Sequence, residues 1–294
     1  MSTAVRGPST AVGNPQNSET NRFTTACPVD LTTITPLILT YNEEANIDRT
    51  LGRLTWAERV VVVDSYSTDA TVDLATAYDN VNLVQREFDD HTSQWNYGLD
   101  QVETDWVLSL DADYQVPPEF IDEVEASNPS QAVAGYRATF TYCVFGRPLR
   151  ANLYPPRIVL FRNERAQYEQ DGHTQRLTLD GAVEELDTVL KHDDRKSLAR
   201  WFDNQRQYAR LESEKLRASE DLELPDRLRK TDVWGPLLVP LYCLFRKGLI
   251  LDGWPGWYYT LQRTYAELVI ALTHLDGHLR DSIDEGDDET EGTA

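Results

Sequence analysis

The stretch Trp106-Val107-Leu108-Ser109-Leu110-Asp111-Ala112-Asp113 decides the fold prediction for this chain. Its first five residues form an apolar run that is typical of a buried parallel strand. Two carboxylates follow, one residue apart, where the strand gives way to a loop. Asp111 and Asp113 are therefore candidate ligands for Mg²⁺ or Mn²⁺, which favour oxygen ligands and often complete their shell with substrate phosphates. The chain has 49 acidic residues, so an isolated Asp-x-Asp also arises by chance and the flanking sequence must decide.

Two more apolar runs come earlier in the chain and also end in polar residues. The first covers 34–40 and leads into a polar turn and a helical pattern, and the second covers 60–63 and ends at Asp64. Strands that alternate with helices predict a doubly wound α/β domain, whose ligands bind at the carboxyl ends of the strands. We therefore expect Asp64 and the Asp111/Asp113 pair to open into one crevice.

These motifs resemble those of the inverting family-2 glycosyltransferases of the GT-A fold, most closely the small members that build lipopolysaccharide core and other surface glycans. Those enzymes carry T-Y-N-E-E-x-N-I after a first strand, matched here by Thr40–Ile47, and V-V-D-S-x-S-T-D-x-T, matched by Val62–Thr71. Their D-x-D is matched by Asp111–Asp113. The resemblance covers residues 33–275 and is densest before residue 115.

The resemblance implies a fold and a set of binding residues. The implied fold is α/β, a GT-A doubly wound sheet that is mixed but mainly parallel, flanked by helices and followed by a C-terminal helical extension. Asn96 and Asp111 would line the nucleotide-sugar site, and Asp113 with Asp111 would hold Mg²⁺ or Mn²⁺ on the donor diphosphate. The residues implied to hold the nucleotide base and ribose are Thr40, Tyr41, Glu43 and Asp64. Each also has a purely structural interpretation, as a turn, helix-cap or packing residue.

An inverting transfer needs a base that takes the proton of the acceptor hydroxyl, and a carboxylate or a histidine can do this. Relatives of the lipopolysaccharide type carry V-H-E where this chain has Thr174-Gln175, and glutamine cannot accept a proton. Asp171 is the first candidate for the base, His173 the second and Glu169 the third. The same segment also fits an ordered loop that is capped by Asp171, so the assignment of the base stays open.

Cationic loops follow the predicted strand over 132–145. Arg150 and Arg157 are candidates to meet a phosphate of the donor or the acceptor, because the guanidinium group matches phosphate in a bidentate way. Solvated surface arginines are the alternative. Residues 192–196, His-Asp-Asp-Arg-Lys, form a second charged segment, which fits equally well a loop that ties the sheet to the next helix.

Residues 196–275 are expected to form a helical region. Residues 233–245 are almost wholly apolar, Arg246 and Lys247 follow, and the next stretch is rich in Trp and Tyr. Neither half reaches the roughly 18–20 uninterrupted apolar residues of a spanning helix. Aromatic residues with basic neighbours suit contact with a membrane surface, so a peripheral membrane contact is predicted. A soluble helical pair that covers the catalytic domain is the alternative.

The two ends of the chain are expected to be disordered. Residues 1–32 form a Ser/Thr/Asn-rich leader without the apolar segment of a signal peptide, and residues 276–294 hold eight acidic residues against one arginine. Between them, residues 33–195 are the predicted GT-A domain for nucleotide sugar and acceptor. The net charge of −21 argues against nucleic acid as a partner. Three scattered cysteines argue against a disulfide framework and favour a cytoplasmic protein. Together with the aromatic segment, this predicts a peripheral location at the inner face of the cell membrane.

The sequence therefore predicts a metal-dependent inverting glycosyltransferase. Its donor is a nucleotide-diphosphate sugar, with a UDP-sugar expected, and its acceptor is a glycan or a lipid-linked molecule. A non-catalytic GT-A-fold binding or scaffold protein is one alternative, which Gln175 in place of a carboxylate favours. A sugar-phosphate nucleotidyltransferase is the other, although its first strand should end in a Gly-rich phosphate loop rather than in Tyr-Asn-Glu-Glu.

Overall fold

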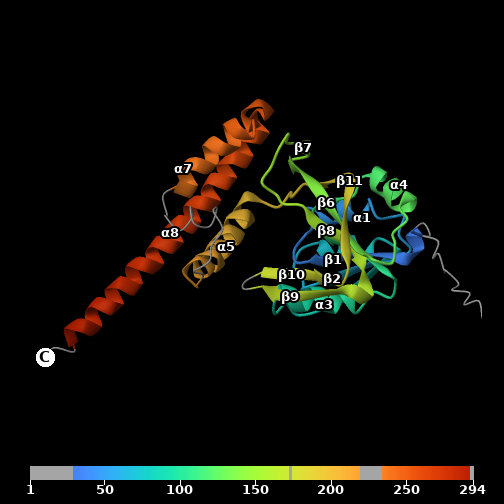
Figure 1. The fold of residues 1–294 in the computed structure, drawn as a ribbon, viewed down its shortest axis with the longest axis horizontal. Coiled ribbons are helices and arrows are strands. Elements are labelled where there is room, and N and C mark those ends of the chain that lie inside the picture. The colour runs from blue at the N-terminus through green and yellow to red at the C-terminus, as the bar shows by residue number, and fades with distance from the viewer. Residues whose placement is uncertain (1–28, 172–173, 219–233, 292–294) are drawn as a thin grey trace, which may run out of the picture.

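Figure 1 shows the computed structural model of the protein, which describes residues 29–171, 174–218 and 234–291. Its centre is a nine-stranded sheet in the order β3-β2-β1-β4-β8-β6-β11-β5, with β7 paired to β6. The strands are β1 Ile34–Thr40, β2 Val60–Asp64, β3 Val81–Gln85, β4 Trp106–Asp111, β5 Tyr114–Gln115, β6 Val133–Val144, β7 Arg147–Pro148, β8 Arg157–Arg162 and β11 Ala182–His192.

Strands β3, β2, β1 and β4 form a wholly parallel half of the sheet. β1 lies between β2 and β4, with Thr40 opposite Asp64 and Leu39 opposite Asp111. Helices cover both faces, so β1, β2 and β4 are almost continuously apolar, as parallel strands usually are. The carboxyl ends of the three strands therefore meet at one edge, where ligands of doubly wound sheets bind.

Two layers of helices flank the parallel half. α1, α2 and α4 cover one face, where Leu51, Ala75 and Phe120 join one buried apolar cluster. α3 covers the other face, where Trp95 packs together with Tyr168 of a separate two-stranded hairpin, β9–β10. The elements of the two layers are α1 Ile47–Leu51, α2 Thr71–Thr76, α4 Pro118–Ala126, α3 His91–Leu99, β9 Ala166–Asp171 and β10 Thr174–Leu179.

The second half of the sheet is mixed, and it returns the chain to the carboxyl end of β4. β8 is antiparallel to β4 and β6, whereas β11 is parallel to β6. The short strand β5 pairs with the end of β11, so that Tyr114 lies opposite His192. The predicted architecture, a mixed sheet flanked by helices with a C-terminal helical extension, is confirmed. The hairpin β9–β10 and strand β11 are additions that the sequence pattern did not indicate.

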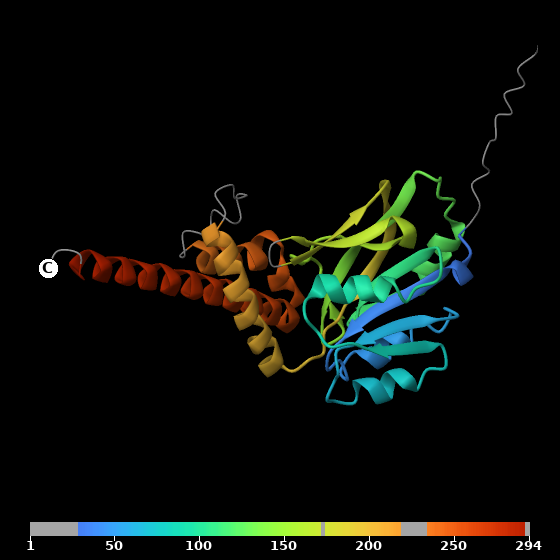
Figure 2. The same ribbon diagram turned by 90° about the horizontal axis from the view of Figure 1, so that it is seen from below.

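The helical extension consists of α5 Leu198–Ala218, α7 Trp234–Leu241, a π-helical turn Tyr242–Arg246, a 3-10 turn Leu249–Asp252 and α8 Trp254–Glu291. α8 contacts both α5 and α7 and projects away from the sheet (Figures 1 and 2). Tyr259 and Leu249 are buried in one cluster with Val144 of β6, and Arg150 Nε lies 2.7 Å from Asp252 Oδ1. The extension is thus fixed to the sheet near β6 and β7.

The structure differs from the predicted ends in two places. Val29 is buried in the main core and a 3-10 turn spans Leu31–Thr33, so the folded part begins before residue 33. α8 continues to Glu291 through most of the segment expected to be a disordered tail. Extending an existing helix is easier than nucleating one, and Arg280 forms an ion pair of 2.8 Å with Asp276 one turn earlier. In the described residues, no helix combines the length and apolar character needed to cross a membrane.

Candidate functional site

Asp64 organises the carboxyl ends of β1 and β2. Its side chain is fully buried and accepts hydrogen bonds from Thr40 Oγ1 at 3.0 Å, from Gln85 Nε2 at 3.1 Å, and from both the backbone N–H and the hydroxyl of Ser67. All of these partners are donors, so a carboxylate fits the position. Asp64 and Thr40 thus hold the strand ends and the following turn together.

Asn42 shapes the turn after β1. Its backbone is left-handed, with φ of 55°, a conformation that asparagine tolerates better than most residues. Its side-chain oxygen accepts a hydrogen bond from the backbone N–H of Thr68 at 2.6 Å, and the backbone N–H of Asn42 donates to Ser67 Oγ at 2.7 Å. Hydrogen bonds at this turn therefore join the segment after β1 to the segment after β2.

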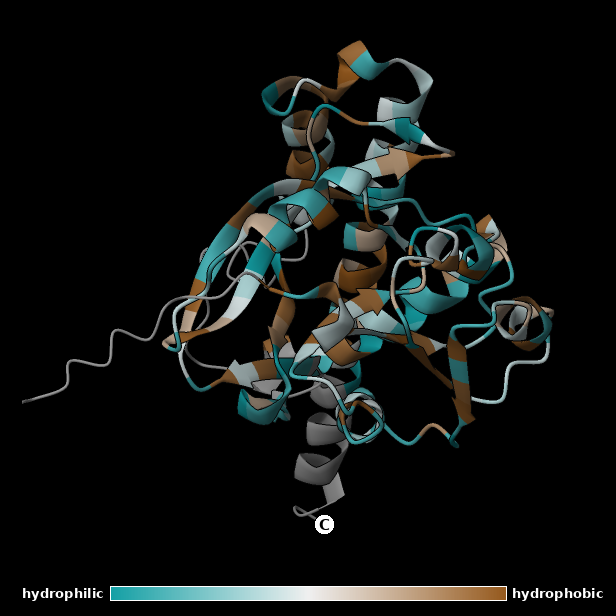
Figure 3. Ribbon diagram, turned by 90° about the vertical axis from the view of Figure 1, so that its right-hand side faces the viewer, coloured by the Kyte–Doolittle hydropathy of each residue, from teal (hydrophilic) through white to brown (hydrophobic). Residues whose placement is uncertain are grey.

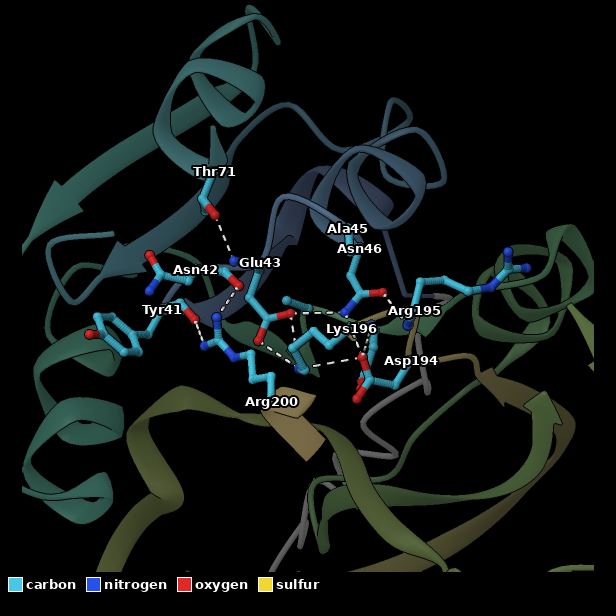
Figure 4. A network of polar contacts seen from close by, with 12 residues as sticks. Tyr41, Asn42, Glu43, Ala45, Asn46, Thr71, Asp194, Arg195, Lys196 and Arg200 are labelled. Carbon is cyan, nitrogen blue, oxygen red and sulfur yellow. Dashed lines mark hydrogen bonds and ion pairs between the residues drawn. The ribbon is translucent and has the colours of Figure 1, made fainter. Parts of the chain in front are cut away.

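Glu43 and Lys196 form a buried ion pair beside the turn (Figure 4). Lys196 Nζ lies 2.9 Å and 3.1 Å from the two carboxylate oxygens of Glu43, and Asn46 Nδ2 donates to the same carboxylate and to Asp194. Burial raises the pKa of Glu43, which favours the neutral acid. Burial also disfavours the charged form of Lys196, but the negative charges of Glu43 and Asp113 outweigh it and raise the pKa of Lys196. The two-oxygen geometry favours the ionised pair.

Tyr41 presents an exposed ring next to this network. Arg200, in the first turn of α5, donates to the carbonyl oxygens of Tyr41 and Asn42 at 2.5 Å and 2.9 Å. Its guanidinium carbon lies 5.6 Å from the centre of the Tyr41 ring. The start of α5 is therefore hydrogen-bonded to the turn that follows β1 (Figure 4).

Asp111 is the last residue of β4, Asp113 follows two residues later, and the two side chains differ in their surroundings. Asp111 is exposed, whereas Asp113 is buried and its Oδ2 lies 3.1 Å from Nε2 of His192. Asp113 Oδ1 and His192 Nδ1 are both buried, and neither has a hydrogen-bond partner among the residues that the structure describes. A buried polar atom without a partner is costly, so these two atoms mark a place where a ligand would be stabilising.

The charges of this group are coupled. Burial disfavours the charged forms of Asp113 and His192, but each stabilises the other, which lowers the pKa of Asp113 and raises that of His192. Burial by the surrounding protein and the charge of Asp113 raise the pKa of Asp111, although its side chain remains exposed to solvent. A divalent cation between the two carboxylates would remove this repulsion.

An aromatic wall adjoins Asp113. The ring of His192 lies 4.6 Å from Tyr154 and 4.8 Å from Tyr142, centre to centre, and the hydroxyl groups of Tyr154 and Tyr114 hydrogen-bond to each other. The guanidinium of Arg157 stacks over Tyr154 at 5.6 Å and forms no ion pair with any carboxylate that the structure describes. Arg157 thus brings a positive charge to the wall of the site, whereas Arg150 is paired with Asp252 in the helical extension.

Residues 37–177 match the family model described as glycosyl transferase family 2. The chain carries a family-2 glycosyltransferase domain. It is 34% identical over 106 residues to an uncharacterized glycosyltransferase of Rickettsia bellii, a match that covers 36% of each protein. A second uncharacterized glycosyltransferase, from Rickettsia typhi, is 33% identical over 93 residues, 31% of this chain and 32% of that protein. The similarity thus spans about a third of the length of these relatives.

Two solved structures are similar in shape at low sequence identity. One is the mannosyltransferase PcManGT from Pyrobaculum calidifontis in complex with GDP-Man and Mn²⁺, with 15% identity, a TM-score of 0.49 and coverage of 86% of this chain and 91% of that one. The other is S. aureus TarS 1–349 in complex with UDP-GlcNAc, with 16% identity, a TM-score of 0.42 and coverage of 82% and 89%. The family assignment rests on the sequence match.

The structure brings most of the predicted binding residues of the family-2 domain to one edge of the sheet, but Asn96 has another environment. Its amide donates to the carbonyl oxygen of Tyr168 at 2.8 Å and accepts the N–H of Tyr168 at 3.0 Å. Both ends of the side chain therefore hold α3 to the β9 strand. His192 and Lys196 were not predicted as site residues, yet they contact Asp113 and Glu43.

Two of the three candidate bases, Glu169 and Asp171, belong to β9. Asp171 ends β9 opposite Thr174, although its side chain is outside the described part of the structure. His173 lies outside the described residues altogether, and Glu169 is exposed on β9. Gln170 accepts a hydrogen bond of 2.9 Å from Thr92, so the hairpin is held at the N-terminal turn of α3.

The residues after β4 fit a divalent cation with few protein ligands. No cluster of three or more His, Cys, Asp or Glu side chains suited to a metal ion is found within the described ranges. Mg²⁺ is often held by one or two carboxylates and takes its remaining ligands from water and substrate phosphates. The exposed Asp111 and the unpaired Oδ1 of Asp113 provide such a pair.

Proposed function

We propose that this protein transfers a sugar from a nucleotide-diphosphate donor, with a UDP-sugar expected, to a glycan or lipid-linked acceptor with inversion at the sugar carbon. One observation carries the proposal: within a family-2 domain, β4 ends in the exposed Asp111 and is followed by the buried Asp113, next to the polar ends of β1 and β2. The 33–195 unit would bind donor and acceptor, and residues 196–275 would form the covering helical region. A cytoplasmic location agrees with the cysteine usage.

Donor binding would follow from the environment of each side chain. The exposed ring of Tyr41 offers a stacking surface for the nucleotide base, with Arg200 held over it. Glu43 and Asp111 would contact the nucleotide sugar, while Thr40 and Asp64 would act by fixing the turn that positions Tyr41. Asn96 would act in the same indirect way by holding the β9–β10 hairpin.

Asp111 and Asp113 would hold Mg²⁺ or Mn²⁺, which neutralises the charge of the departing nucleoside diphosphate. His192 would keep Asp113 ionised and oriented through its hydrogen bond of 3.1 Å. Arg157 would add a guanidinium donor to a phosphate oxygen, as bidentate recognition by arginine allows. These residues together stabilise negative charge at the position where the donor bond breaks.

The acceptor hydroxyl attacks the sugar carbon, and its proton passes to a base as the bond to the diphosphate oxygen breaks. We assign this base to Asp171, because it ends β9 next to Gln170, which is hydrogen-bonded to Thr92 in the first turn of α3. His173 is the second candidate. Glu169 is the third candidate.

Metal dependence can be tested by calorimetric titration with UDP in the presence of Mn²⁺ and again with EDTA. We expect binding that weakens by at least about tenfold without the metal, because the diphosphate would lose its bridge to Asp111 and Asp113. Equal affinity in both titrations would contradict the metal site. A screen of other nucleotide diphosphates under the same conditions would identify the preferred base.

The base assignment can be tested with Asp171→Asn, for which we expect a transfer rate about 10²–10⁴-fold lower with almost unchanged donor affinity. His173→Ala is the paired variant. A wild-type rate for Asp171→Asn together with an inactive His173→Ala would reverse the two roles. If both variants remain active, the base lies outside the hairpin tip.

A non-catalytic binding protein is the second candidate function, favoured by Gln175 in place of a carboxylate. Such a protein would bind nucleotide sugar without consuming it. Incubation with donor and Mn²⁺, followed by chromatography of the nucleotide, separates the two candidates. Release of nucleoside diphosphate by the wild type but not by Asp113→Asn would support the enzyme.

A further inference from the structure

We propose that the turn between α7 and α8 is a docking surface for a lipid membrane that contains anionic head groups. We name this surface the apolar cap, and it consists of residues 234–257 together with the loop 145–150. The cap, which includes β7, lies at the top of the molecule in Figures 1 and 3. The proposal concerns the apolar cap and does not rest on the transfer reaction.

The apolar cap exposes an unusual amount of large apolar side chain. Leu251 is 70% exposed and Phe245 is 64% exposed, although both lie in ordered helical turns. Monomeric soluble proteins rarely expose contiguous apolar patches of this kind, and such patches mark sites of interaction. The exposed members in 234–257 are Trp234, Leu237, Leu238, Leu241, Tyr242, Phe245, Ile250, Leu251, Trp254 and Trp257.

These side chains are not needed to attach the cap to the protein. A different set of residues does that, since Cys243, Leu249 and Tyr259 are buried in one cluster with Val144 and Leu149. The backbone reverses at two left-handed glycines, Gly248 and Gly253, with φ of 71° and 66°. The resulting hook turns its buried residues inward and holds the remaining apolar side chains towards solvent.

The charge of the cap is opposite to that of the chain as a whole. The protein has 49 acidic and 28 basic residues, yet the two cap segments contain four basic residues and one acidic residue, Asp252. Asp252 is itself paired with Arg150 at 2.7 Å. Lys247 lies over the ring of Tyr242 at 5.7 Å, and Arg147 lies over the ring of Trp254 at 5.3 Å.

This combination favours a membrane over a second copy of the chain. Trp and Tyr side chains are preferred at the head-group level of a bilayer, and basic residues are attracted to an anionic leaflet. Two caps that face each other would instead bring like charges together. The cap therefore matches an anionic lipid surface in both its apolar and its basic groups.

The cap also connects to the candidate site through a short series of aromatic rings. Tyr259, which is buried beneath the cap, lies 4.8 Å from Tyr142, and Tyr142 lies 4.8 Å from His192, centre to centre. His192 in turn contacts Asp113. Only a few side chains would thus separate a membrane at the cap from the candidate site, as a lipid-linked acceptor would require.

The test is sedimentation of the full-length protein with vesicles of phosphatidylcholine alone and with equimolar phosphatidylcholine and phosphatidylserine. We expect stronger binding to the second, weakening as salt rises. Phe245→Ser with Leu251→Ser should lower the partition coefficient by at least about tenfold, because two large apolar side chains are lost from the interface. Arg246→Glu with Lys247→Glu should abolish the preference for phosphatidylserine.

The control is Leu268→Ser with Leu279→Ser, which replaces two exposed leucines of α8 outside the cap. It should bind as the wild type does. Equal sedimentation of the Phe245/Leu251 variant and the wild type, with circular dichroism showing both folded, would overturn the proposal. So would a wild-type dimer without lipid that the same cap substitutions convert to monomer, because the occupant would then be a second copy.

Discussion

Two aspartates at the carboxyl ends of parallel strands, Asp64 at the end of β2 and Asp113 just after β4, differ in how many hydrogen bonds the protein gives them. Both are buried, and both stand in motifs that match the family-2 glycosyltransferases. Asp64 accepts four hydrogen bonds from three residues of its own domain. Asp113 pairs with His192 through one oxygen, and its other oxygen has no hydrogen-bond partner in the described part of the chain.

The difference separates a residue that builds the site from a residue that is free to act in it. A saturated carboxylate has no remaining capacity for a ligand unless its present partners move. A buried carboxylate with an unpaired oxygen is stabilised when a cation or a hydrogen-bond donor binds to it. A motif match alone gives both aspartates the same weight, and only their surroundings distinguish them.

The largest effect should come from Asp113→Asn. We expect the transfer rate to fall by about 10³-fold or more, because the neutral amide no longer attracts the cation that stabilises the leaving diphosphate. The variant should remain folded, since an amide can still hydrogen-bond to His192. Radiolabelled sugar transfer together with circular dichroism checks both statements.

Asp122→Asn, which removes an exposed carboxylate of α4, is the matched control for Asp113→Asn and should keep the wild-type rate. If Asp113→Asn binds nucleotide with the same metal dependence as the wild type, the comparison fails, because Asp113 would then be only a partner of His192.

Asp64→Asn should act on stability instead. Its amide group would face hydrogen-bond donors from Thr40, Ser67 and Gln85, and we expect the free energy of unfolding to fall by about 3 kcal/mol. Urea denaturation followed by tryptophan fluorescence measures this, with the exposed Asp73→Asn as control. If Asp64→Asn keeps full stability but loses nucleotide affinity, Asp64 contacts the donor directly.

The parallel half of the fold could be predicted because its strands are buried on both faces. The apolar runs that end at Thr40, Asp64 and Asp111 are visible without knowledge of their neighbours. The strand β11 was missed because it has mostly polar residues, with Leu186 and Leu190 its only buried hydrophobic residues. Its partner β6, not its own composition, holds it in the sheet.

The site was predictable on the same terms. Asp111 and Asp113 lie within one local pattern, whereas His192 reaches Asp113 only through the pairing of β5 with β11, far along the chain. Residues 192–196 fitted a simple loop equally well. Their dense charge, His-Asp-Asp-Arg-Lys, is the one signal in the sequence that would have suggested a network, and it does not identify the partners.

Arg157→Gln extends the comparison to a cation that forms no direct ion pair with a carboxylate in the described residues, although the charge of Asp111 acts on it. We expect KM for the donor to rise by about tenfold, because a guanidinium bond to a phosphate oxygen would be lost while the stacking surface of Tyr154 remains. Arg137→Gln is the control, since Arg137 is already paired with Glu185 at 2.9 Å. A change confined to KM for the acceptor would place the anionic group on the acceptor instead.

The smallest effect should come from Asp69, a second saturated carboxylate of the β2 motif. Its oxygens accept the N–H and hydroxyl of Thr71 and the N–H of Glu44 at 3.2 Å. Burial opposes its charge, but these hydrogen bonds prevail and lower the pKa of Asp69 below 3.8. Because the folded protein binds the proton less readily than the unfolded chain, the charge contributes stability above about pH 4, and this contribution is lost as pH falls through the folded pKa.

Asp69→Asn should therefore be less stable than the wild type at pH 7. The loss in the free energy of unfolding should be only about 1 kcal/mol, because the amide oxygen can still accept some of the same hydrogen bonds. The difference should shrink steadily as urea unfolding is repeated at lower pH, because the wild-type carboxyl becomes neutral as well. Asp73→Asn, again the exposed control, should show almost no difference at any pH. A difference for Asp69→Asn that persists unchanged in acid would mean that the shape of the turn, and not the charge of the saturated carboxylate, stabilises this end of β2.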